Sequence, residues 1–392
     1  MKQSTRTTHQ QIHVPATLDV QSVERELSEL WRVQNAEGRA DDNESALIRA
    51  RVLNLMIYVA AEDALDEINE ALAEISSTHP CRALVMCADS AGADEDIEMF
   101  VSAFCQDMED DAPERQLCCE QVSLVARGRF AVELPSAAVP LLVSDLPTFL
   151  YWHDRQHFTD ESFKRLSHAA DRVVIDSAMF DKPHRDVRAL SAFMEKEVDE
   201  SAAVSDLNWA RLTAWRALLA GFFDAPESRA NLERINRVLV EYVSHESAPE
   251  EIAPQALMIV GWLASRLGWR ATAEKIEEVD AARKRVFLEK NGRTISVEMK
   301  QVERPEMRRG RLARVRLETA DDAGANFEVL RSEDGVYLET CAREVAESRR
   351  ERVFKVRNRS TGNLLGRELE IQAHDRIYEE AVSAALEIIG TN

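Results

Sequence analysis

Apolar and polar residues follow two different patterns along this chain, and the first half has the simpler one. Short runs of almost continuous apolar residues predict buried strands at 51–60, 82–88, 116–126, 148–152 and 171–177. Between these runs, apolar residues recur every three or four positions and predict helices at 18–34, 62–75, 93–107, 160–170 and 183–199, with a short one opened by Pro135. Apolar strands that alternate with helices are typical of a parallel sheet covered on both faces.

The second half begins with helical patterns and continues with alternating ones. Helices are predicted at 206–224 and 253–269, with a strand at 235–243 between them. Several segments of alternating apolar and polar residues follow between 285 and 357, and Asn291 with Gly292 predicts a hairpin turn. The chain closes on a helical pattern. Runs of strands flanked by helices are typical of an α+β domain with an antiparallel sheet.

We therefore expect three parts in this chain of 392 residues. The first is a flexible polar tail over 1–17. The second is an α/β domain over 18–200, with a mostly parallel sheet in Rossmann-like layers. The third is an α+β domain with an antiparallel sheet over 201–392, joined to the second by a linker at 199–206. No apolar run approaches the roughly 20 residues that span a bilayer. The N-terminal residues lack the apolar segment of a signal peptide, and six cysteines in so long a chain favour a reducing cytoplasm.

The charge is strongly negative and unevenly distributed. The net charge of −21 argues against nucleic acid or an anionic membrane as the main partner, because both need a cationic face. Residues 62–114 carry sixteen Asp and Glu against one Arg, whereas residues 283–316 carry twelve Lys and Arg against four Glu. This distribution suits steering toward a protein or an anionic ligand. Two solvated faces would give the same pattern.

Motifs for the common chemistries of α/β proteins are missing. The sequence has no G-x-G-x-x-G, no G-x-x-x-x-G-K-[ST], no G-x-S-x-G and no C-x-x-C. We therefore expect no dinucleotide cofactor and no catalytic residue. His153 and His157 stand four residues apart, a spacing that binds zinc on a helix, but they follow a strand directly and are expected in a loop without metal.

Polar residues follow the predicted parallel strands, where α/β proteins bind ligands. They include Glu62, Asp89, the pair His153 and Asp154, and Asp176. An enzyme or a sugar-phosphate-sensing module that uses His153, Asp154 and Asp176 is therefore one interpretation. The more ordinary interpretation is that these residues start loops and cap helices.

Several stretches in both halves resemble one family, the glucose-6-phosphate dehydrogenase assembly protein OpcA. They are HPCRALVM at 79–86, CCEQVSL at 118–124, DLPTFLYW at 145–152 and DLNWARLTAWRALLAGFFD at 206–224. The last is the most specific. The resemblance runs over roughly residues 48–270 and weakens in the C-terminal third.

The resemblance implies a non-catalytic cytoplasmic protein. Such a protein would bind glucose-6-phosphate dehydrogenase, promote its active oligomer and raise its activity, which supports the oxidative pentose phosphate pathway and NADPH production. Two features depart from the family pattern. HDRQHF follows Trp152 where a turn rich in Gly and Pro is expected, and a cysteine pair near the C-terminus is missing, which argues against thioredoxin-type control.

Candidate contact residues come from three segments. Together they are Trp152, His153 and Asp154 after a strand, Asn208 and Arg211 beside the apolar stripe of the 206–224 helix, and Arg308, Arg309 and Arg311 in an arginine-rich stretch. A cluster of arginines repels itself unless a counter-charge is near. That counter-charge could come from the partner enzyme, from the acidic 62–114 region, or from a bound phosphate or nucleotide. A small-molecule effector thus stays among the alternatives.

Overall fold

The computed structural model divides the chain into two compact units, which are described one at a time. The described residues are 7–8, 20–38, 46–49, 51–76, 78–107, 115–155, 158–197, 202–272, 276–320, 324–343, 349–356, 360–371 and 373–390. The first unit takes Met1–Ile175, Glu197–Leu207 and Arg359–His374. The second takes Asp176–Lys196, Asn208–Asn358 and Asp375–Asn392. Both units are discontinuous in sequence, and the chain crosses between them several times.

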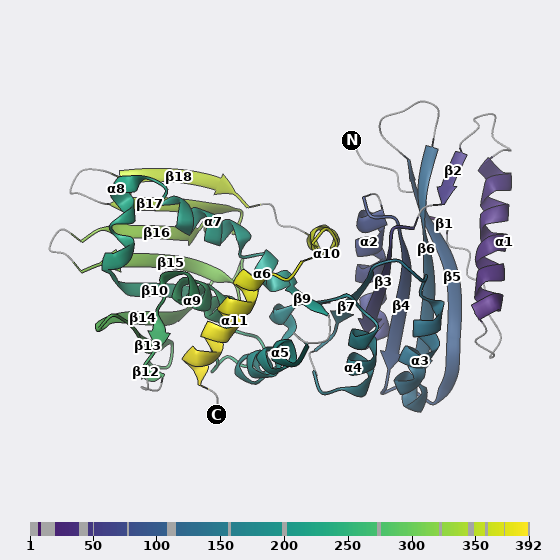
Figure 1. The fold of residues 1–392 in the computed structure, drawn as a ribbon, viewed down its shortest axis with the longest axis horizontal. Coiled ribbons are helices and arrows are strands. Elements are labelled where there is room, and N and C mark those ends of the chain that lie inside the picture. The colour runs from purple at the N-terminus through teal and green to yellow at the C-terminus, as the bar shows by residue number, and fades with distance from the viewer. Residues whose placement is uncertain are drawn as a thin grey trace. The chain divides into compact units, whose positions relative to one another are not determined.

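The first unit is built on a mixed, mostly parallel sheet (Figure 1). Its strands are β1 (Thr7–Thr8), β2 (Ala46–Arg49), β3 (Leu53–Val59), β4 (Cys81–Asp89), β5 (Glu95–Asp107), β6 (Arg115–Arg127), β7 (Thr148–His153), β8 (Arg172–Ile175) and β9 (Ala203–Asp206). The order is β1-β5-β6-β4-β3-β7-β8-β9, with β2 paired to β6. From β6 to β9 all neighbours are parallel, in the strand order of a doubly wound nucleotide-binding fold. The expected mostly parallel sheet is confirmed.

Helices cover both faces of this sheet. They are α1 (Val20–Gly38), α2 (Leu65–Ser76), α3 (Leu134–Ala138), α4 (Glu161–His168) and α10 (Thr361–Glu368), with the 3-10 turns η1 (Glu62–Ala64), η2 (Gly128–Glu133) and η3 (Val139–Leu141). Figure 1 shows α1 and α2 on opposite faces. Helix α10, from near the C-terminus, packs on α2. Because both faces are covered, every residue of β4 from Cys81 to Ala88 is buried, which explains the continuous apolar runs.

Two expectations for this region are wrong. The helix expected around 93–107 is the strand β5, antiparallel to β6. Its buried residues Met99, Val101 and Ala103 alternate with half-buried ones, which is the period of a strand. The linker expected at 199–206 contains β9, whose described residues are all buried. Within the tail expected at 1–17, Thr7–Thr8 pair with β5, and the rest of the tail lies outside the described residues.

The second unit contains a mostly antiparallel sheet. Its strands are β10 (Ile235–Val243), β11 (Arg270–Ala271), β12 (Glu277–Asp280), β13 (Arg283–Lys290), β14 (Arg293–Val302), β15 (Leu312–Thr319), β16 (Asn326–Arg331), β17 (Tyr337–Arg343) and β18 (Arg349–Lys355). The order is β11-β13-β14-β10-β15-β16-β17-β18, with β12 paired to β13, and only β10 and β14 run parallel among the described pairs. Asn291 and Gly292 turn the β13–β14 hairpin at φ values of 52° and 77°, as predicted.

Helices lie against one face of this sheet, so buried and half-buried residues alternate along β14 to β17. The helical elements are α5 (Pro183–Glu197), α6 (Leu207–Ala210), α7 (Thr213–Gly221), α8 (Pro226–Arg229), α9 (Pro254–Leu267) and α11 (Arg376–Ile389), with η4 (Ser177–Met179) and η5 (Leu232–Arg234). Helices α9 and α11 pack closely at Gly261, where a Cβ would overlap the carbonyl oxygen of Ala381. The chain needs glycine at this position.

The helix expected over 206–224 is two helices, α6 and α7, which meet at Leu212. The apolar spacing predicts an inward stripe of Leu212, Trp215, Leu219 and Phe222. The first three are confirmed at most 1% exposed, whereas Phe222 is half-buried. Asn208, expected beside the stripe, is instead 3% exposed and makes buried hydrogen bonds. We therefore withdraw Asn208 as a surface contact residue.

Candidate functional site

The end of strand β7 offers less to a partner than the sequence suggested. Trp152 is 2% exposed and stacks on Tyr58 with 3.9 Å between ring centroids. It also meets the ring of Phe163 edge-on. Trp152 therefore packs inside the first unit, and we withdraw it as a contact residue. His153 and Asp154 are half-buried, so they stay candidates, while His157 lies outside the described residues.

The carboxyl ends of β3 and β7 form the point where ligands bind in doubly wound sheets. Here the strand β3 leads into η1, which begins with Glu62 and Asp63 in place of a glycine-rich turn. Arg127 pairs with Glu62, and with Glu95 at 2.6 Å, so this cation is already neutralised. Across the same end, the Tyr151 hydroxyl and the His153 Nδ1 are 2.8 Å apart. Carboxylates at this place disfavour a diphosphate group.

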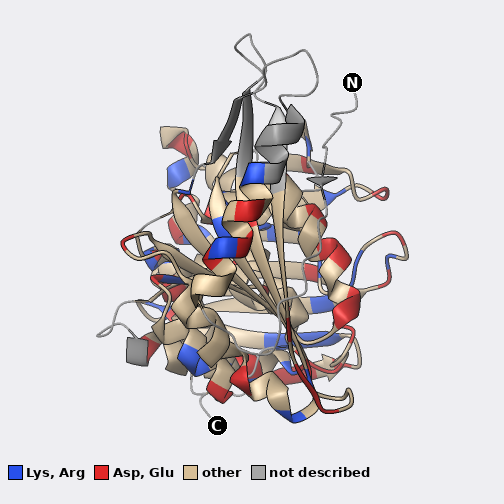
Figure 2. Ribbon diagram, turned by 90° about the vertical axis from the view of Figure 1, so that its right-hand side faces the viewer, with Lys and Arg blue, Asp and Glu red and all other residues tan. Residues whose placement is uncertain are grey.

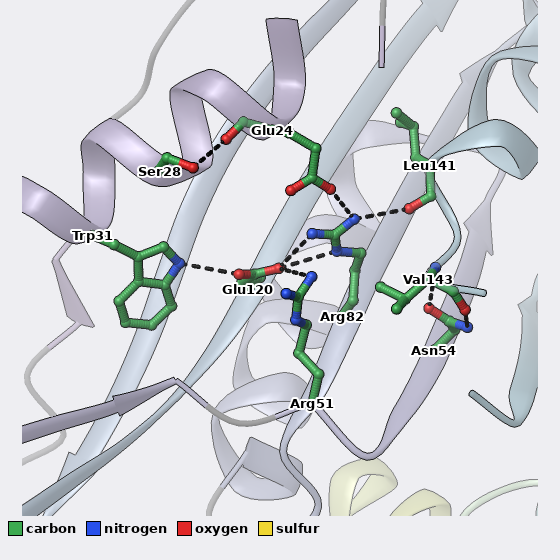
Figure 3. Close-up of polar contacts among 9 residues, drawn as sticks. All are labelled: Glu24, Ser28, Trp31, Arg51, Asn54, Arg82, Glu120, Leu141 and Val143. Carbon is green, nitrogen blue, oxygen red and sulfur yellow. Dashed lines mark hydrogen bonds and ion pairs between the residues drawn. The ribbon is translucent and has the colours of Figure 1, made fainter. Parts of the chain in front are cut away.

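A buried ion network joins α1 to the sheet, and sequence reasoning did not identify it (Figure 3). Arg82 on β4 is 3% exposed and donates to Glu120 on β6 at 2.8 Å and to Glu24 on α1 at 2.6 Å. Glu120 is fully buried and also accepts from the indole nitrogen of Trp31 at 3.0 Å. The guanidinium of Arg51 lies 3.5 Å from the same carboxylate.

Positive and negative charges in this network balance. Burial alone would lower the pKa of Arg82, but the bonds to Glu24 and the charge of Glu120 outweigh it and raise that pKa. Figure 2 looks onto α1, along which basic and acidic residues lie close to one another. We interpret the network as structural, because every charge in it that is removed from water has an opposite charge beside it.

A second group of arginines, in the second unit, gathers around Asp176. Arg211 donates through both terminal nitrogens to the two carboxylate oxygens of Asp176, at 2.6 and 2.7 Å. Both side chains are largely removed from water, with 13% and 9% exposure. Asp176 also caps η4 by accepting from the backbone N–H of Ala178. Asp176 is thus bound within the second unit, and Arg211 is a half-buried partner rather than an open surface residue.

A chain of buried amides fixes the segments that carry these arginines. Asn208 donates to the Ser177 hydroxyl at 3.1 Å and accepts from the Gln255 side chain at 2.8 Å. Gln255 in turn accepts from the backbone N–H of Leu312 at 3.0 Å. The chain therefore joins η4, α6, the start of α9 and the start of β15, which places Arg211 and Arg311 in one neighbourhood.

No acid among the described residues is paired with Arg311. Within the described parts of the chain its guanidinium makes no hydrogen bond or ion pair. Burial together with the nearby charges of Arg211, Arg331 and Arg308, opposed by Asp176, lowers the pKa of Arg311 to about 9. The group thus stays charged at neutral pH. The four arginines Arg211, Arg308, Arg311 and Arg331, with Asp176, are called the arginine cluster below.

Arg331 was missed by sequence reasoning because it stands at the end of β16, away from the arginine-rich stretch. Its Nε donates to the carbonyl of Leu312 at 3.2 Å, and another nitrogen donates to the carbonyl of Gly335 at 3.1 Å. Burial lowers its pKa. Strand pairing of β15 with β16 brings it to the cluster, and a single sequence carries no direct signal of that pairing.

The turn before β15 presents the remaining candidates. Gly310 has a φ of 74°, and its N–H faces the carbonyls of Val243 and Ser244 at 3.1 and 3.2 Å. Arg308 and Arg309 are exposed, and Arg309 donates to the hydroxyl of Ser244. These two arginines are therefore accessible to a partner. Arg311, two residues further along the chain, is half-buried.

Other arginines of the same stretch are paired inside the sheet. Arg314 lies 3.5 Å from Glu241, and Arg316 donates to Glu328 at 2.6 Å. These counter-charges come from β10 and β16, the strands on either side of β15, and not from the acidic 62–114 region. Arg314 and Arg316 thus need no ligand. Among the described residues, no group of three or more His, Cys, Asp and Glu is arranged to hold a metal ion.

Two family models match most of the chain. The glucose-6-phosphate dehydrogenase subunit N-terminal domain of the OpcA family matches residues 72–192, and the corresponding C-terminal domain matches residues 202–382. The chain belongs to the OpcA family. This confirms the resemblance first seen in the motifs, and it extends OpcA similarity into the C-terminal third, where the motifs were weak.

Curated relatives agree with the OpcA family. A protein provisionally named OxPP cycle protein OpcA from Nostoc punctiforme is 29% identical over 321 residues, which cover 80% of this chain and 66% of that one. Its namesake from Synechocystis is 27% identical, over 80% of this chain and 65% of its own. The chain thus spans slightly less than two thirds of the length of these relatives. The family names associate OpcA with glucose-6-phosphate dehydrogenase and the oxidative pentose phosphate cycle.

Solved structures are similar at a lower level. The WlbA dehydrogenase from Thermus thermophilus has 11% identity and a TM-score of 0.43 over 86% of this chain and 94% of its own. An oxidoreductase domain protein from Kribbella flavida has 9% identity and a TM-score of 0.46 over 87% and 96%. No helix in the described residues is long and apolar enough to cross a membrane.

Proposed function

We propose that this chain is a non-catalytic subunit that binds glucose-6-phosphate dehydrogenase, supports assembly of its active oligomer and raises its activity. The observation that carries the proposal is the match to both domains described as glucose-6-phosphate dehydrogenase subunit. The cytoplasmic location and the lack of a cofactor, expected from the sequence, stay predictions and form part of it.

The ligand-binding end of the first sheet supports a role without catalysis. In enzymes of this strand order, a glycine-rich turn after the first strand lets backbone N–H groups approach a pyrophosphate. Here β3 is followed by Glu62 and Asp63, and their negative charges would repel a phosphate. A chain with this turn would be a poor NADP-binding enzyme, which fits a subunit that acts on the dehydrogenase.

The exposed arginines before β15 are our proposed contact with the enzyme. Arg308 and Arg309 stand side by side on a turn and are accessible, in a chain whose net charge is −21. An acidic surface on the dehydrogenase would be steered toward them, and such steering raises association rates mainly at low salt. His153 and Asp154 are a second, less exposed candidate contact.

The test mixes the purified chain with glucose-6-phosphate dehydrogenase from the same source. We expect a complex on size-exclusion chromatography with light scattering, a larger dehydrogenase oligomer and faster NADP reduction. The chain alone should reduce no NADP. Arg308→Glu with Arg309→Glu should slow association several-fold at low salt and leave the melting temperature unchanged within a degree or two. Arg237→Glu with Arg352→Glu, also exposed in the second unit, is the matched control.

Other outcomes separate the alternatives. Turnover by the chain alone that drops on His153→Ala would favour the enzyme interpretation. If no complex forms with the dehydrogenase at micromolar concentrations, the proposed function fails. Association that ignores both salt and the double reversal would remove Arg308 and Arg309 from the interface while leaving the partner in place.

A further inference from the structure

We propose that the arginine cluster of the second unit is a binding site for a phosphate group, either inorganic or carried by a small metabolite, held by Arg311, Arg211 and Arg308. The inference goes beyond the proposed function, because it concerns a ligand of this chain and not its contact with an enzyme. No substrate turnover is implied.

The arginine cluster carries an excess of positive charge. Asp176 is the one carboxylate among the charges that act on Arg311, and Arg211 already occupies both of its oxygens. The rest of the chain is rich in acids, yet among the described residues no acid forms an ion pair with Arg308, Arg311 or Arg331. Like charges held together in a partly buried place are costly unless an anion joins them. The cluster therefore has more positive charge than Asp176 can balance.

Contacts within the chain hold most of the cluster in place without a ligand. Asp176 holds Arg211, and two backbone carbonyls hold Arg331. The residue after Arg311, Leu312, is bonded to Gln255 in the amide chain that also holds Asn208. Most of the site is thus fixed before a ligand arrives, so binding would cost little conformational entropy.

The unused donors of Arg311 have a geometry that suits a phosphate group. A guanidinium presents five N–H donors in a planar fork, which matches two oxygens of a phosphate. Arg311 uses none of these donors among the described residues and is half-buried, so a small anion can reach it while much of the water is kept away. Arg308, exposed and close enough to act on the charge of Arg311, supplies a further donor at the rim.

Charge also decides between anions. A phosphate monoester carries between one and a half and two negative charges near neutral pH. Four arginines and Asp176 leave an excess of three positive charges, of which a carboxylate would offset one and a phosphate monoester up to about two. The paired arginines of the neighbouring sheet are the contrast, because Arg314 and Arg316 each have a glutamate within ion-pair distance and offer no such site.

The test titrates inorganic phosphate and glucose 6-phosphate into the purified chain in a low-salt buffer free of phosphate, by calorimetry and thermal shift. We expect saturable binding in the micromolar to millimolar range with a raised melting temperature. Arg311→Gln should weaken the affinity by about tenfold or more, the loss typical of one charge-assisted hydrogen-bond partner. Arg311→Lys keeps the positive charge but loses the planar guanidinium. Its affinity for phosphate should lie between those of the unmodified chain and Arg311→Gln.

Arg237→Gln is the control, because it removes one exposed positive charge elsewhere in the second unit. It should bind phosphate like the unmodified chain. Tighter binding of glucose 6-phosphate than of inorganic phosphate would indicate a metabolite, and equal binding would indicate phosphate itself. Should Arg311→Gln fail to fold, Arg308→Gln, which is exposed, tests the same site.

Three results would overturn the proposal. The first is that phosphate does not bind at millimolar concentration. The second is that sodium chloride of equal ionic strength raises the melting temperature as much as phosphate does. The third is that Arg311→Gln and Arg237→Gln both bind phosphate as well as the unmodified chain. The dehydrogenase is absent from this experiment. Its outcome therefore does not depend on whether the proposed partner is correct.

Discussion

The two units of this chain both remove arginines from water, but they treat the charge differently. In the first unit, Arg82 meets the carboxylates of Glu24 and Glu120, and these raise its pKa although burial acts against them. In the second unit, Arg311 lies near other arginines and near one carboxylate, Asp176, which Arg211 already occupies. Burial and the like charges together lower the pKa of Arg311 to about 9. The first arrangement is complete within the protein, and the second lacks an anion.

This difference separates a structural arginine from a ligand-binding one. The Arg82 network joins α1, β4 and β6 by bonds whose acceptors all belong to the chain (Figure 3). Arg311 stands next to a turn with its donors unused among the described residues. A protein that keeps an uncompensated charge loses some stability for it, and such losses are concentrated at functional sites.

The largest expected effect is in the balanced network. Glu120→Gln keeps the shape of the side chain and removes its charge, so Arg82 and Arg51 lose the carboxylate they share. We expect the free energy of unfolding to fall by about 3 kcal/mol, as when one partner of a buried pair is removed. Urea denaturation measures it. Glu29→Gln, on the exposed side of α1, should cause no measurable change. Equal effects of the two substitutions would contradict the structural role.

A smaller loss of stability is expected at Asp176. There, as at Glu120, an arginine donates two hydrogen bonds to a buried carboxylate. Arg211→Ala leaves the buried carboxylate of Asp176 with only the N–H of Ala178 among the contacts described above. The unfolding free energy should fall by about 2 kcal/mol. The sequence alone predicts Arg211 as a surface contact residue beside the apolar stripe. A neutral result, like that expected for the exposed Arg237→Ala, would restore that interpretation.

The sequence predicts the strands and layers of this fold better than it predicts which charged side chains form ion pairs. Residues buried on both faces, as in β3 and β4, give continuous apolar runs, and these identified the parallel strands. Strand β5 was mistaken for a helix because its acidic start, Glu95 to Glu98, resembles a first helical turn, while the alternation of Met99, Val101 and Ala103 is short.

Side-chain partners are less accessible to sequence reasoning, because they are far apart in the chain. The arginine-rich stretch is evident in the sequence. Nothing local shows that Glu241 and Glu328 neutralise Arg314 and Arg316, while no acid among the described residues pairs with Arg311. That difference depends on the pairing of β15 with β10 and β16. It also depends on the amide chain through Gln255.

Arg311→Gln should raise stability, whereas Glu120→Gln and Arg211→Ala should lower it. The substitution removes a half-buried charge that has no counter-charge among the described residues and relieves the repulsion with Arg211 and Arg331. In a buffer without phosphate, the free energy of unfolding should rise by up to about 1 kcal/mol, a value reduced for partial solvent screening. Thermal and urea unfolding measure it. A loss of stability similar to that of Glu120→Gln would mean that Arg311 has a structural partner, and the contrast between the two regions would disappear.

The smallest expected effect is the salt dependence of the stability changes caused by Arg311→Gln and Glu120→Gln. It tests the difference between the two arginine sites without a ligand. Exposed and half-exposed charges are screened over about 8 Å at physiological ionic strength, whereas fully buried pairs are screened much less. The stability gained by Arg311→Gln should therefore shrink by about half or more between low and high sodium chloride, because salt already relieves the repulsion in the unmodified chain. The loss caused by Glu120→Gln should stay nearly constant over the same range, since Glu120 is fully buried. Unfolding curves of the three proteins at three salt concentrations suffice. If both differences changed equally with salt, the two arginine sites would be electrostatically alike, and a lowered pKa at Arg311 would say nothing about a missing anion.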